Sequence, residues 1–363
     1  MKVLVLWADN RSTNLGVRVL AEGSAALARR SFGNDLDFTF QDPAGAETGV
    51  SLQRRAIQRD IGRTDGPIKE FLSEFDLIWD TGAGDSFTDI YGRGRIARIL
   101  YVQRTAIAAG IPTIMGPQTI GPFSSHLISR VATRTMNRMS AVLTRDSAST
   151  SFARDHGVEP DSTATDVVFA LEQPASHHQH DVLINVSGLL WSGDAHVDSM
   201  DYRKRVADLL TELNSAGRSV ALLAHVIDNP FLDNDVRAIA EVQAQFDIPV
   251  VVPADLADAR SHIAGANLVI ASRMHACLNA LSVGTPAVAW AYSRKFGPLF
   301  NDLGWTASID LRSEQDPVAR TLSLMGGGEI DSSRVVALRA VADERLSAAA
   351  SRLRESLKFA RPK

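Results

Sequence analysis

Short apolar runs recur along the chain and alternate with longer segments whose apolar residues follow a helical spacing. Runs of this length predict buried β-strands, and the segments between them, such as 94–109 and 234–245, predict helices. In the amino-terminal half the predicted strands are 3–7, 37–40, 77–79, 113–115, 141–144 and 163–168. In the carboxyl-terminal half they are 182–186, 219–224, 248–252, 268–271, 287–290 and 307–309.

The repeated order of strand, helix and strand predicts parallel pairing with right-handed crossovers. A chain of 363 residues is also too long for one ordinary core. We therefore expect an α/β protein with two Rossmann-like, doubly wound parallel-sheet domains, residues 1–171 and 181–330, joined by a linker over 172–180. Residues 331–363 predict a long amphipathic helix that packs across the domains, with partner binding as the alternative.

The expected linker, residues 172–180, is polar and has no periodicity. It contains His177, His178 and His180, and histidine is a common metal ligand. Because no regular element within the segment orients these side chains, the sequence favours a solvated linker. We therefore expect no metal site here.

Composition narrows the class of protein. The formal charge of −4 argues against general binding to nucleic acid or to a membrane surface. Cys277, the single cysteine, excludes an intrachain disulfide, and its place on the apolar side of a predicted helix indicates an inert core thiol.

No apolar run approaches the roughly 18 residues that span a bilayer, and the first apolar run is too short for a secretion signal. We expect a cytoplasmic protein, and a homo-oligomer is compatible with the sequence.

Polar loops follow the predicted strands of the amino-terminal half. Asn14 lies in the loop after the first strand, directly before a helix whose amino terminus could hold an anion. After the third strand, Gly84 would let the backbone approach a ligand, and Asp85 could accept a hydroxyl proton. Loops of this kind are common, and an ordinary tight turn explains the second one equally well.

Further candidates follow later strands. Gln118 lies between two Gly-Pro pairs, which predicts a rigid loop. For Arg145 and Asp146 the favoured interpretation is that they pair with each other, or that Asp146 caps the next helix. His225 ends a strand, where an imidazole can exchange a proton near neutral pH or serve a structural purpose.

The segment 267–295 contains the strongest signal for a site. The first of its two predicted strands is followed at once by Arg273 and His275, and the second is followed by Tyr292 and Lys295. Carboxyl ends of parallel strands meet at one edge of the sheet, where open α/β sheets bind ligands. An arginine fork and a lysine suit carboxylate or phosphate. The pattern predicts a receptor for a small, highly charged anion, with ion pairing of Arg273 to a nearby aspartate as the structural alternative.

Several familiar motifs are absent from the sequence, including the P-loop, the zinc-protease motif and the serine-hydrolase elbow. The stretch Gly82-Ala83-Gly84 lacks the third glycine of a dinucleotide fingerprint, so we expect no nicotinamide cofactor. Asp233 and Asp235 have the spacing of a sugar-nucleotide metal motif. Because they open a predicted helix, we expect both to be surface carboxylates.

Taken in order, the motifs resemble the polysaccharide pyruvyl transferase family over nearly the whole chain. The matching elements are Asn14-Leu15-Gly16, residues 76–84, residues 116–122, Thr144-Arg145-Asp146, Asp166, His225 with Asp228, Ser272-Arg273-Met274-His275-Ala276, Gly284-Thr285-Pro286, and Tyr292 with Lys295. The chain departs from the family pattern at Val17 and Ala83, both in the amino-terminal half.

The resemblance implies a glycosyltransferase-B-like pair of domains that face each other across a cleft. It implies a transferase that uses phosphoenolpyruvate as co-substrate, without a further cofactor or metal. The acceptor would be two hydroxyls of one sugar in a cell-surface polysaccharide or its lipid-linked precursor, and the products a pyruvate ketal and phosphate. The amino-terminal domain would bind the acceptor and the carboxyl-terminal domain the donor. Peripheral association with a membrane-bound precursor is compatible with this picture.

The resemblance also implies residue roles. Arg273 would bind the donor anion, His275 would supply acid, and His225 and Asp85 would deprotonate acceptor hydroxyls. The residues expected to bind substrate are Lys295, Tyr292, Asn14, Gly84, Gln118, Arg145 and Ser272. Two alternatives stay open: a nucleotide-sugar glycosyltransferase or epimerase of the same architecture, and a non-catalytic protein that binds an anionic glycan.

Overall fold

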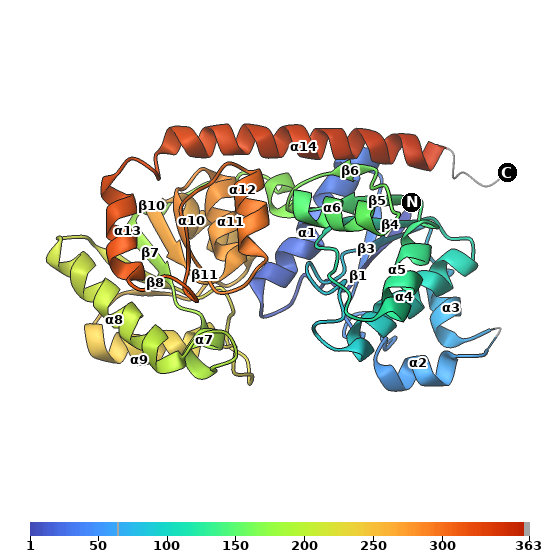
Figure 1. Cartoon of the computed structure of the whole chain (residues 1–363), viewed down its shortest axis with the longest axis horizontal. Helices are drawn as coiled ribbons and strands as arrows, with labels where there is room; N and C mark the ends of the chain where they lie inside the picture. The colour runs from blue at the N-terminus through green and yellow to red at the C-terminus, as the bar shows by residue number, and fades with distance from the viewer. Residues whose placement is uncertain (64, 359–363) are drawn as a thin grey trace. The chain divides into compact units, whose positions relative to one another are not determined.

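The computed structural model describes residues 1–63 and 65–358 (Figure 1). It contains two six-stranded parallel sheets, as the alternation of strands and helices predicts. Internal contacts divide the chain into two units. The first comprises Met1–Asn10, Leu20–Leu171 and the chain from Ala342 onward, and the second comprises Arg11–Val19 and Glu172–Val341.

The first unit has the strand order β2-β1-β3-β4-β5-β6. Its strands are β1 (Lys2–Leu6), β2 (Asp37–Gln41), β3 (Leu77–Asp80), β4 (Thr113–Gln118), β5 (Ala141–Thr144) and β6 (Ser162–Thr163). Its helices are α1 (Leu15–Phe32), which begins in the second unit, α2 (Arg54–Asp60), α3 (Pro67–Leu72), α4 (Arg93–Ala108), α5 (His126–Met136) and α6 (Ser147–Asp155), with the 3₁₀ turn η1 (Val167–Ala170). The helices α2, α3, α4 and α5 pack against one another.

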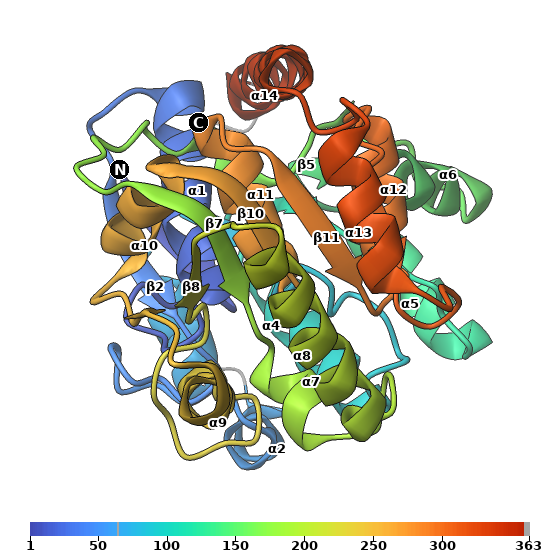
Figure 2. The ribbon, with the colours of Figure 1, turned by 90° about the vertical axis from the view of Figure 1, so that its left-hand side faces the viewer.

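The second unit has the strand order β12-β11-β10-β7-β8-β9. Its strands are β7 (His180–Asn185), β8 (Val220–Leu223), β9 (Val250–Val251), β10 (Ala266–Ala271), β11 (Ala287–Ala291) and β12 (Ser308–Asp310). Its helices are α7 (Gly188–Ser192), α8 (Ser199–Ser215), α9 (Asp235–Phe246), α10 (Leu256–Ala264), α11 (Met274–Val283), α12 (Phe296–Asp302) and α13 (Pro317–Gly326). Figures 1 and 2 show α8 and α9 on one face of this sheet and α10 and α11 on the other.

Each sheet has one place where the strand order reverses. In the first unit it lies between β1 and β3, and in the second between β7 and β10. Neighbouring crossovers leave in opposite directions there, and open α/β sheets generally bind ligands at the carboxyl ends of two such strands. The residues after β3 and after β10 are therefore the natural places for a site.

Local sequence explains how the segment after β10 is built. Strand β10 is apolar and buried over Leu268–Ala271, because helices cover both faces of the sheet. Helix α11 follows at once and ends at Gly284, whose φ of 97° lies in the left-handed region. Pro286 lies two residues further and prevents the helix from continuing. The short connection returns the chain directly into β11.

Every predicted strand overlaps an observed one, and the largest difference concerns residues 163–168. The strand there ends at Thr163, and residues Val167–Ala170 form a 3₁₀ turn instead. Asp166 is the reason, because its carboxylate accepts a hydrogen bond from the Val168 amide and caps that turn.

The long carboxyl-terminal helix is α14 (Ser332–Lys358), and residues 359–363 of its predicted range lie outside the described residues. Its first part, up to Val341, belongs to the second unit. From Ala342 onward it belongs to the first unit, where Asp343 forms an ion pair of 2.8 Å with Arg30. Among the helices of the described ranges, none is long and apolar enough to cross a membrane.

The segment 172–180 has no helix, yet its backbone is anchored. Arg260 donates a hydrogen bond of 3.0 Å to the Glu172 carbonyl, and the Ser261 hydroxyl donates one of 2.9 Å to the Ala175 carbonyl. His180 is the first residue of β7. Most of the segment is exposed, and α10 holds its backbone in place.

Candidate functional site

The carboxyl ends of β7 and β10 in the second unit are joined by Asn185. Its side-chain oxygen accepts a hydrogen bond of 3.1 Å from the Arg273 amide, and its carbonyl accepts one from the Ser272 amide. Asn185 is buried, at 2% exposure, so these bonds are shielded from water. They fix the start of α11 against the neighbouring strand at the place where the strand order reverses.

Asp235 is the central acceptor of this edge. It is fully buried at the start of α9. One carboxylate oxygen accepts from the Gly188 amide at 2.8 Å and from two nitrogens of Arg273. The other accepts from the amides of His225 and Val226 and from the side chain of Asn185. The carboxylate thus joins the segments after β7, β8 and β10. The expectation that Asp235 is a surface carboxylate is wrong, because these donors offset the cost of its burial.

Arg273 is largely buried, and its guanidinium points to Asp235. Its Nε and Nη2 atoms lie 3.1 and 2.7 Å from one Asp235 oxygen, and Nη2 also donates to the Asp233 carbonyl. Burial, the largest single cause, lowers the pKa of Arg273, but the charges of Asp235, Tyr292 and Asp233 and the hydrogen bond to Asp235 together raise it. The observed arrangement is the ion pair that the sequence left open as the alternative. It supports a positioning role for Arg273 in place of direct donor binding.

His225 is also buried, at 1% exposure. The side-chain amide of Asn279 donates to its Nε2 atom at 3.1 Å and also to the His275 carbonyl at 2.8 Å. Burial, followed by the charges of His275 and Arg273, lowers the pKa of His225 well below its ordinary value. A neutral, buried ring that already accepts a hydrogen bond supports a structural role, in place of the expected deprotonation of an acceptor hydroxyl.

His275 is partly exposed in the first turn of α11, and the loop before α1 packs against it. A Cβ atom at Gly16 would lie 2.8 Å from the His275 Nδ1 atom, so only glycine leaves room for the ring. Asn14 holds that loop, because its side chain accepts from the Gly16 amide at 2.9 Å and its backbone pairs with Val226. Asn14 therefore helps to fix the position of the His275 ring.

Tyr292 and Lys295 follow β11. The Tyr292 ring is 7% exposed and packs edge-on against Phe296. The same ring lies 5.0 Å from the ring of His196. Desolvation, and then the charges of Lys295 and Arg312, lower the pKa of His196. Lys295 is partly exposed. Its charge reaches His196 and makes this part of the edge positive.

Ser272 is buried, at 2% exposure, and its hydroxyl lies 2.8 Å from that of Tyr202. Tyr202 is itself buried in α8, and its hydroxyl accepts from the Ser187 amide. Burial, the dominant cause, raises the pKa of Tyr202 to about 12. These bonds tie β10 to α8 and support a structural role for Ser272 in place of the expected substrate contact.

In the first unit the loops after β3, β4 and β5 are joined by backbone hydrogen bonds. The Thr119 amide donates to Gly84, and the Arg145 amide donates to Gln118. Gly84 has a φ of 78°, and Gln118 is fully buried. The partly exposed Asp85 accepts a hydrogen bond of 3.0 Å from the Tyr91 hydroxyl. Asp85 thus lies at the carboxyl edge of the first sheet, while the Gln118 side chain packs beneath the loop that follows β3.

Arg145 is buried at 1% exposure and does not pair with Asp146. Its guanidinium lies 3.4 Å from Asp166 and donates to the Thr119 hydroxyl at 2.6 Å. Asp146 caps α6 by accepting from the Ser149 amide, as the sequence predicts. Arg145 therefore holds the loop after β4 against η1, which supports a structural role in place of substrate binding.

Asp80, the last residue of β3, is a fully buried acid. It accepts from the Trp7 indole at 2.8 Å and from the Gly82 amide at 2.7 Å. Burial raises the pKa of Asp80 to about 6, and these hydrogen bonds only partly oppose the shift. Asp80 therefore organises the glycine loop after β3 and titrates within two units of neutral pH.

The comparison with known families decides the identity. A family model described as polysaccharide pyruvyl transferase matches residues 19–294. The chain belongs to the polysaccharide pyruvyl transferase family. A curated relative, the amylovoran biosynthesis protein AmsJ of Erwinia amylovora, is 24% identical over 301 residues, which cover 76% of this chain and 71% of AmsJ.

Solved structures support the glycosyltransferase-B-like fold. HepE from Anabaena, in complex with UDP-glucose, has a TM-score of 0.59 and 14% identity, over 99% of this chain and 100% of HepE. The UDP-GlcNAc 2-epimerase from Neisseria meningitidis, bound to UDP-GlcNAc, has a TM-score of 0.56 and 11% identity, over 99% of each chain. At these identities the likeness concerns the fold alone.

Four residues of this candidate site were not predicted from the sequence of this transferase: Asp235, Asn185, Asn279 and His196. Asn185 had the clearest signal, because it is the last residue of a strand at the point of reversal. Asp235 had the weakest, because an aspartate at the start of a helix is ordinarily an exposed residue that favours the helix dipole. Only the fold shows that this particular helix begins against three strand ends.

We predict that Asp235→Asn destabilises the protein by about 3–5 kcal/mol, because it leaves the buried Arg273 charge without its partner. Urea unfolding measures the change. Asp233→Asn is the matched control, since Asp233 is partly exposed and meets Arg273 through its carbonyl, and it should cost less than about 1 kcal/mol. Equal losses in the two variants would contradict the central role of Asp235.

The raised pKa of Asp80 predicts a pH dependence of stability with a definite sign. Because the pKa is higher in the folded state, protonation of Asp80 favours folding. This contribution to the free energy of unfolding is fully present below about pH 4 and is lost as the pH rises through about 6. Asp80→Asn removes this titration, so the stability of the natural protein relative to the variant should fall by up to about 3 kcal/mol between pH 4 and 7. Urea unfolding across this range tests it, with exposed Asp35→Asn as the control. A constant difference would contradict the buried-acid assignment.

Proposed function

We propose that this family member transfers the enolpyruvyl group of phosphoenolpyruvate to two hydroxyls of one sugar, forming a pyruvate ketal and releasing phosphate. The observation that carries the proposal is the family match over residues 19–294, which includes the segments that follow β3, β4, β5, β7, β8 and β10. The relative AmsJ supports a polysaccharide or its precursor as the acceptor. The positive edge of the second unit supports an anionic donor.

The proposed reaction balances without an oxidant or reductant. The methylene carbon of the donor takes a proton, which leaves an oxocarbenium-like centre at the adjacent carbon. One sugar hydroxyl adds there, phosphate leaves, and the second hydroxyl closes the ring. Of the two hydroxyl protons, one balances the new methyl group and the other leaves with phosphate. The protein must therefore supply an acid, a base and positive charge.

We assign the acid to His275, because it is the partly exposed imidazole at the start of α11. Lys295 would hold the carboxylate or phosphate of the donor, with His196 beside it. Arg273 would act through its pair with Asp235 by fixing the start of α11. Asp85 of the first unit would accept a proton from an acceptor hydroxyl.

Phosphoenolpyruvate should therefore raise the melting temperature of the protein, and Lys295→Ala should abolish that rise because the donor loses its cation. His275→Gln should keep the rise but lower turnover by about 10²-fold or more, since general acid catalysis contributes 10²–10⁴-fold. The measurements are a thermal shift and phosphate release. Lys204→Ala is the matched control, because Lys204 is exposed and pairs with Asp208.

The same thermal-shift assay includes UDP-glucose and UDP-GlcNAc. Stabilisation by either sugar nucleotide, without stabilisation by phosphoenolpyruvate, would contradict the proposal and favour a nucleotide-sugar enzyme of the same fold. Binding of phosphoenolpyruvate without phosphate release, across a panel of polysaccharide precursors, would favour the non-catalytic alternative.

The first unit has a basic surface that supports a membrane-bound acceptor. Between Asp89 and Asp146 the sequence contains eight arginines and no acidic residue, although the whole chain is negative. Six of these arginines are exposed on or next to α4 and α5: Arg93, Arg95, Arg104, Arg130, Arg134 and Arg138. Such an acid-free cluster attracts an anionic surface.

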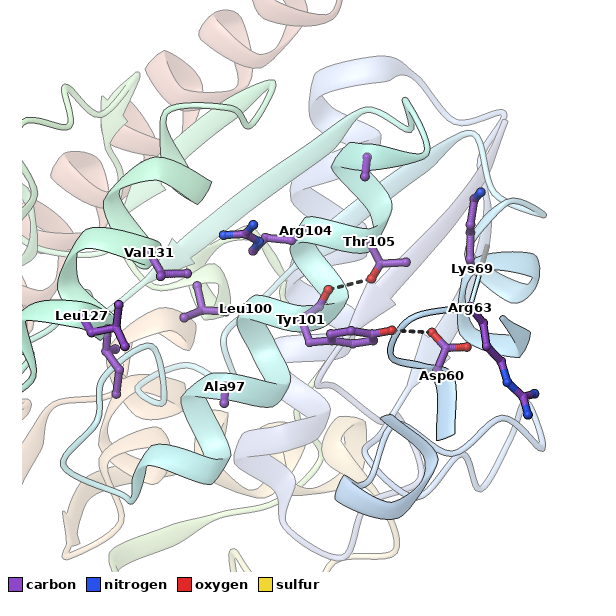
Figure 3. A pocket seen from close by; sticks show the side chains of 12 residues that line it. Asp60, Arg63, Lys69, Ala97, Leu100, Tyr101, Arg104, Thr105, Leu127 and Val131 are labelled. Atoms are coloured by element: carbon purple, nitrogen blue, oxygen red, sulfur yellow. Dashed lines mark hydrogen bonds between the residues drawn. The ribbon is translucent and has the colours of Figure 1, made fainter. Parts of the chain in front are cut away.

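A pocket of about 690 Å³ lies beside this surface (Figure 3). Leu100, Leu127 and Val131 line its apolar part, and Arg104 lies at its edge. Leu127 is 70% exposed, which is unusual for a leucine among charged neighbours. Asp60 in the same pocket is engaged by the Tyr101 hydroxyl at 2.6 Å. The combination suits a lipid surface with anionic head groups, and we propose that α4 and α5 bring the enzyme to a lipid-linked precursor.

We predict that the protein binds vesicles of phosphatidylcholine that contain about 30% phosphatidylglycerol, and that it does not bind vesicles of phosphatidylcholine alone. The double variant Arg104→Glu with Arg130→Glu should reduce binding more than about tenfold, since each arginine contributes about 1 kcal/mol near such a surface. Arg334→Glu, at an exposed position on α14, is the matched control. Co-sedimentation measures binding, and equal binding by all three proteins would contradict the assignment.

A further inference from the structure

Three histidines from two segments meet near the amino end of β7. One side-chain nitrogen from each of His178, His180 and His262 lies within 4.8 Å of the other two. The Nε2 atom of His180 is 3.0 Å from the Nδ1 atom of His262, and the rings of His178 and His262 stack with centroids 3.6 Å apart. All three side chains are partly buried, so the cluster is held by the fold while remaining accessible from solution.

The backbone around the cluster is fixed. His180 donates its amide to the Gly265 carbonyl at 2.8 Å, which joins the start of β7 to the end of α10. A Cβ atom at Gly265 would lie 2.0 Å from the His178 carbonyl, so the segment packs directly on this glycine. Together with the bond from Ser261 to Ala175, these contacts supply the rigid support for the histidines that the sequence alone did not show.

The pair formed by His180 and His262 suits a metal ion, and His178, whose ring stacks on that of His262, would turn to direct a nitrogen to the same ion. Zinc binds imidazole nitrogens at about 2.0–2.1 Å, so two ligands of a tetrahedral ion lie roughly 3.3 Å apart. The separation of 3.0 Å between His180 and His262 is close to this value. Burial, and then the neighbouring rings, lower the pKa of both His180 and His262, which favours the neutral form that binds metal.

The second nitrogen of His262 faces a carboxylate. Its Nε2 atom lies 3.7 Å from Asp258, one turn earlier on α10. A carboxylate behind a histidine is the usual outer partner of a metal-binding imidazole, where it orients the ring. His262 therefore has the two neighbours that a metal ligand needs, one on each nitrogen.

We propose that His178, His180 and His262 bind one divalent transition-metal ion of the zinc class, with water at the fourth position, and that the ion fastens residues 172–180 to α10. This site is separate from the proposed transfer site. His180 and Asn185 are at opposite ends of β7, five residues apart, which corresponds to about 16 Å along a strand. The ion therefore has a structural role, and the proposal does not depend on the transferase reaction.

The test uses the full chain without a histidine tag, freed of metal with a chelator. Titration calorimetry with Zn²⁺ should show one equivalent bound, and Co²⁺ should give the visible absorption bands of a tetrahedral site. A hundredfold excess of Zn²⁺ over its Kd should raise the melting temperature by roughly 5 °C. His180→Gln and His262→Gln should each weaken Zn²⁺ binding at least tenfold and remove this rise.

His177→Gln is the matched control, because His177 is exposed and adjacent in sequence but outside the cluster. It should bind Zn²⁺ like the natural chain. Circular dichroism verifies that each variant is folded before titration. Absence of stoichiometric binding to the natural chain, or undiminished binding by folded His180→Gln, would overturn the proposal and leave the two rings as a hydrogen-bonded pair.

Discussion

The second unit depends on one buried carboxylate. Asp235 accepts hydrogen bonds from segments that follow β7, β8 and β10, so one carboxylate joins all three. A carboxylate without donors would be very costly at 0% exposure. The strand ends must therefore converge on it, and their convergence determines where α11 begins and where His275 lies.

This arrangement also decides which positive charges a ligand can meet. The charge of Arg273 is largely satisfied by Asp235 inside the protein. Lys295 follows a different strand, β11, and lies closer to solvent, beside His196 of the loop between α7 and α8. The edge thus separates an inner, structural arginine from an outer, accessible lysine. Asp80 has a comparable place in the first unit, where Trp7 and Gly82 donate to it.

The fold could be predicted from the sequence to a large extent, because buried parallel strands are recognisable as short apolar runs. The strand ends were also predictable, since the carboxyl edge follows from the order of the elements. What the sequence could not show was the partner of each polar side chain. Arg145 pairs with Asp166, 21 positions away, and Arg273 pairs with Asp235, 38 positions away. Local spacing has no information about such pairs, and for that reason the sequence could not show that these two arginines are engaged by buried carboxylates.

The contact between Gly16 and His275 has a consequence for comparing members of this family. The space at position 16 is too small for even a methyl group while the imidazole keeps its place. A relative with alanine or a larger residue at the corresponding position must rotate the ring or shift the start of its first helix. The residue at position 16 thus indicates, from sequence alone, whether a homologous protein can keep the same geometry at the imidazole that corresponds to His275.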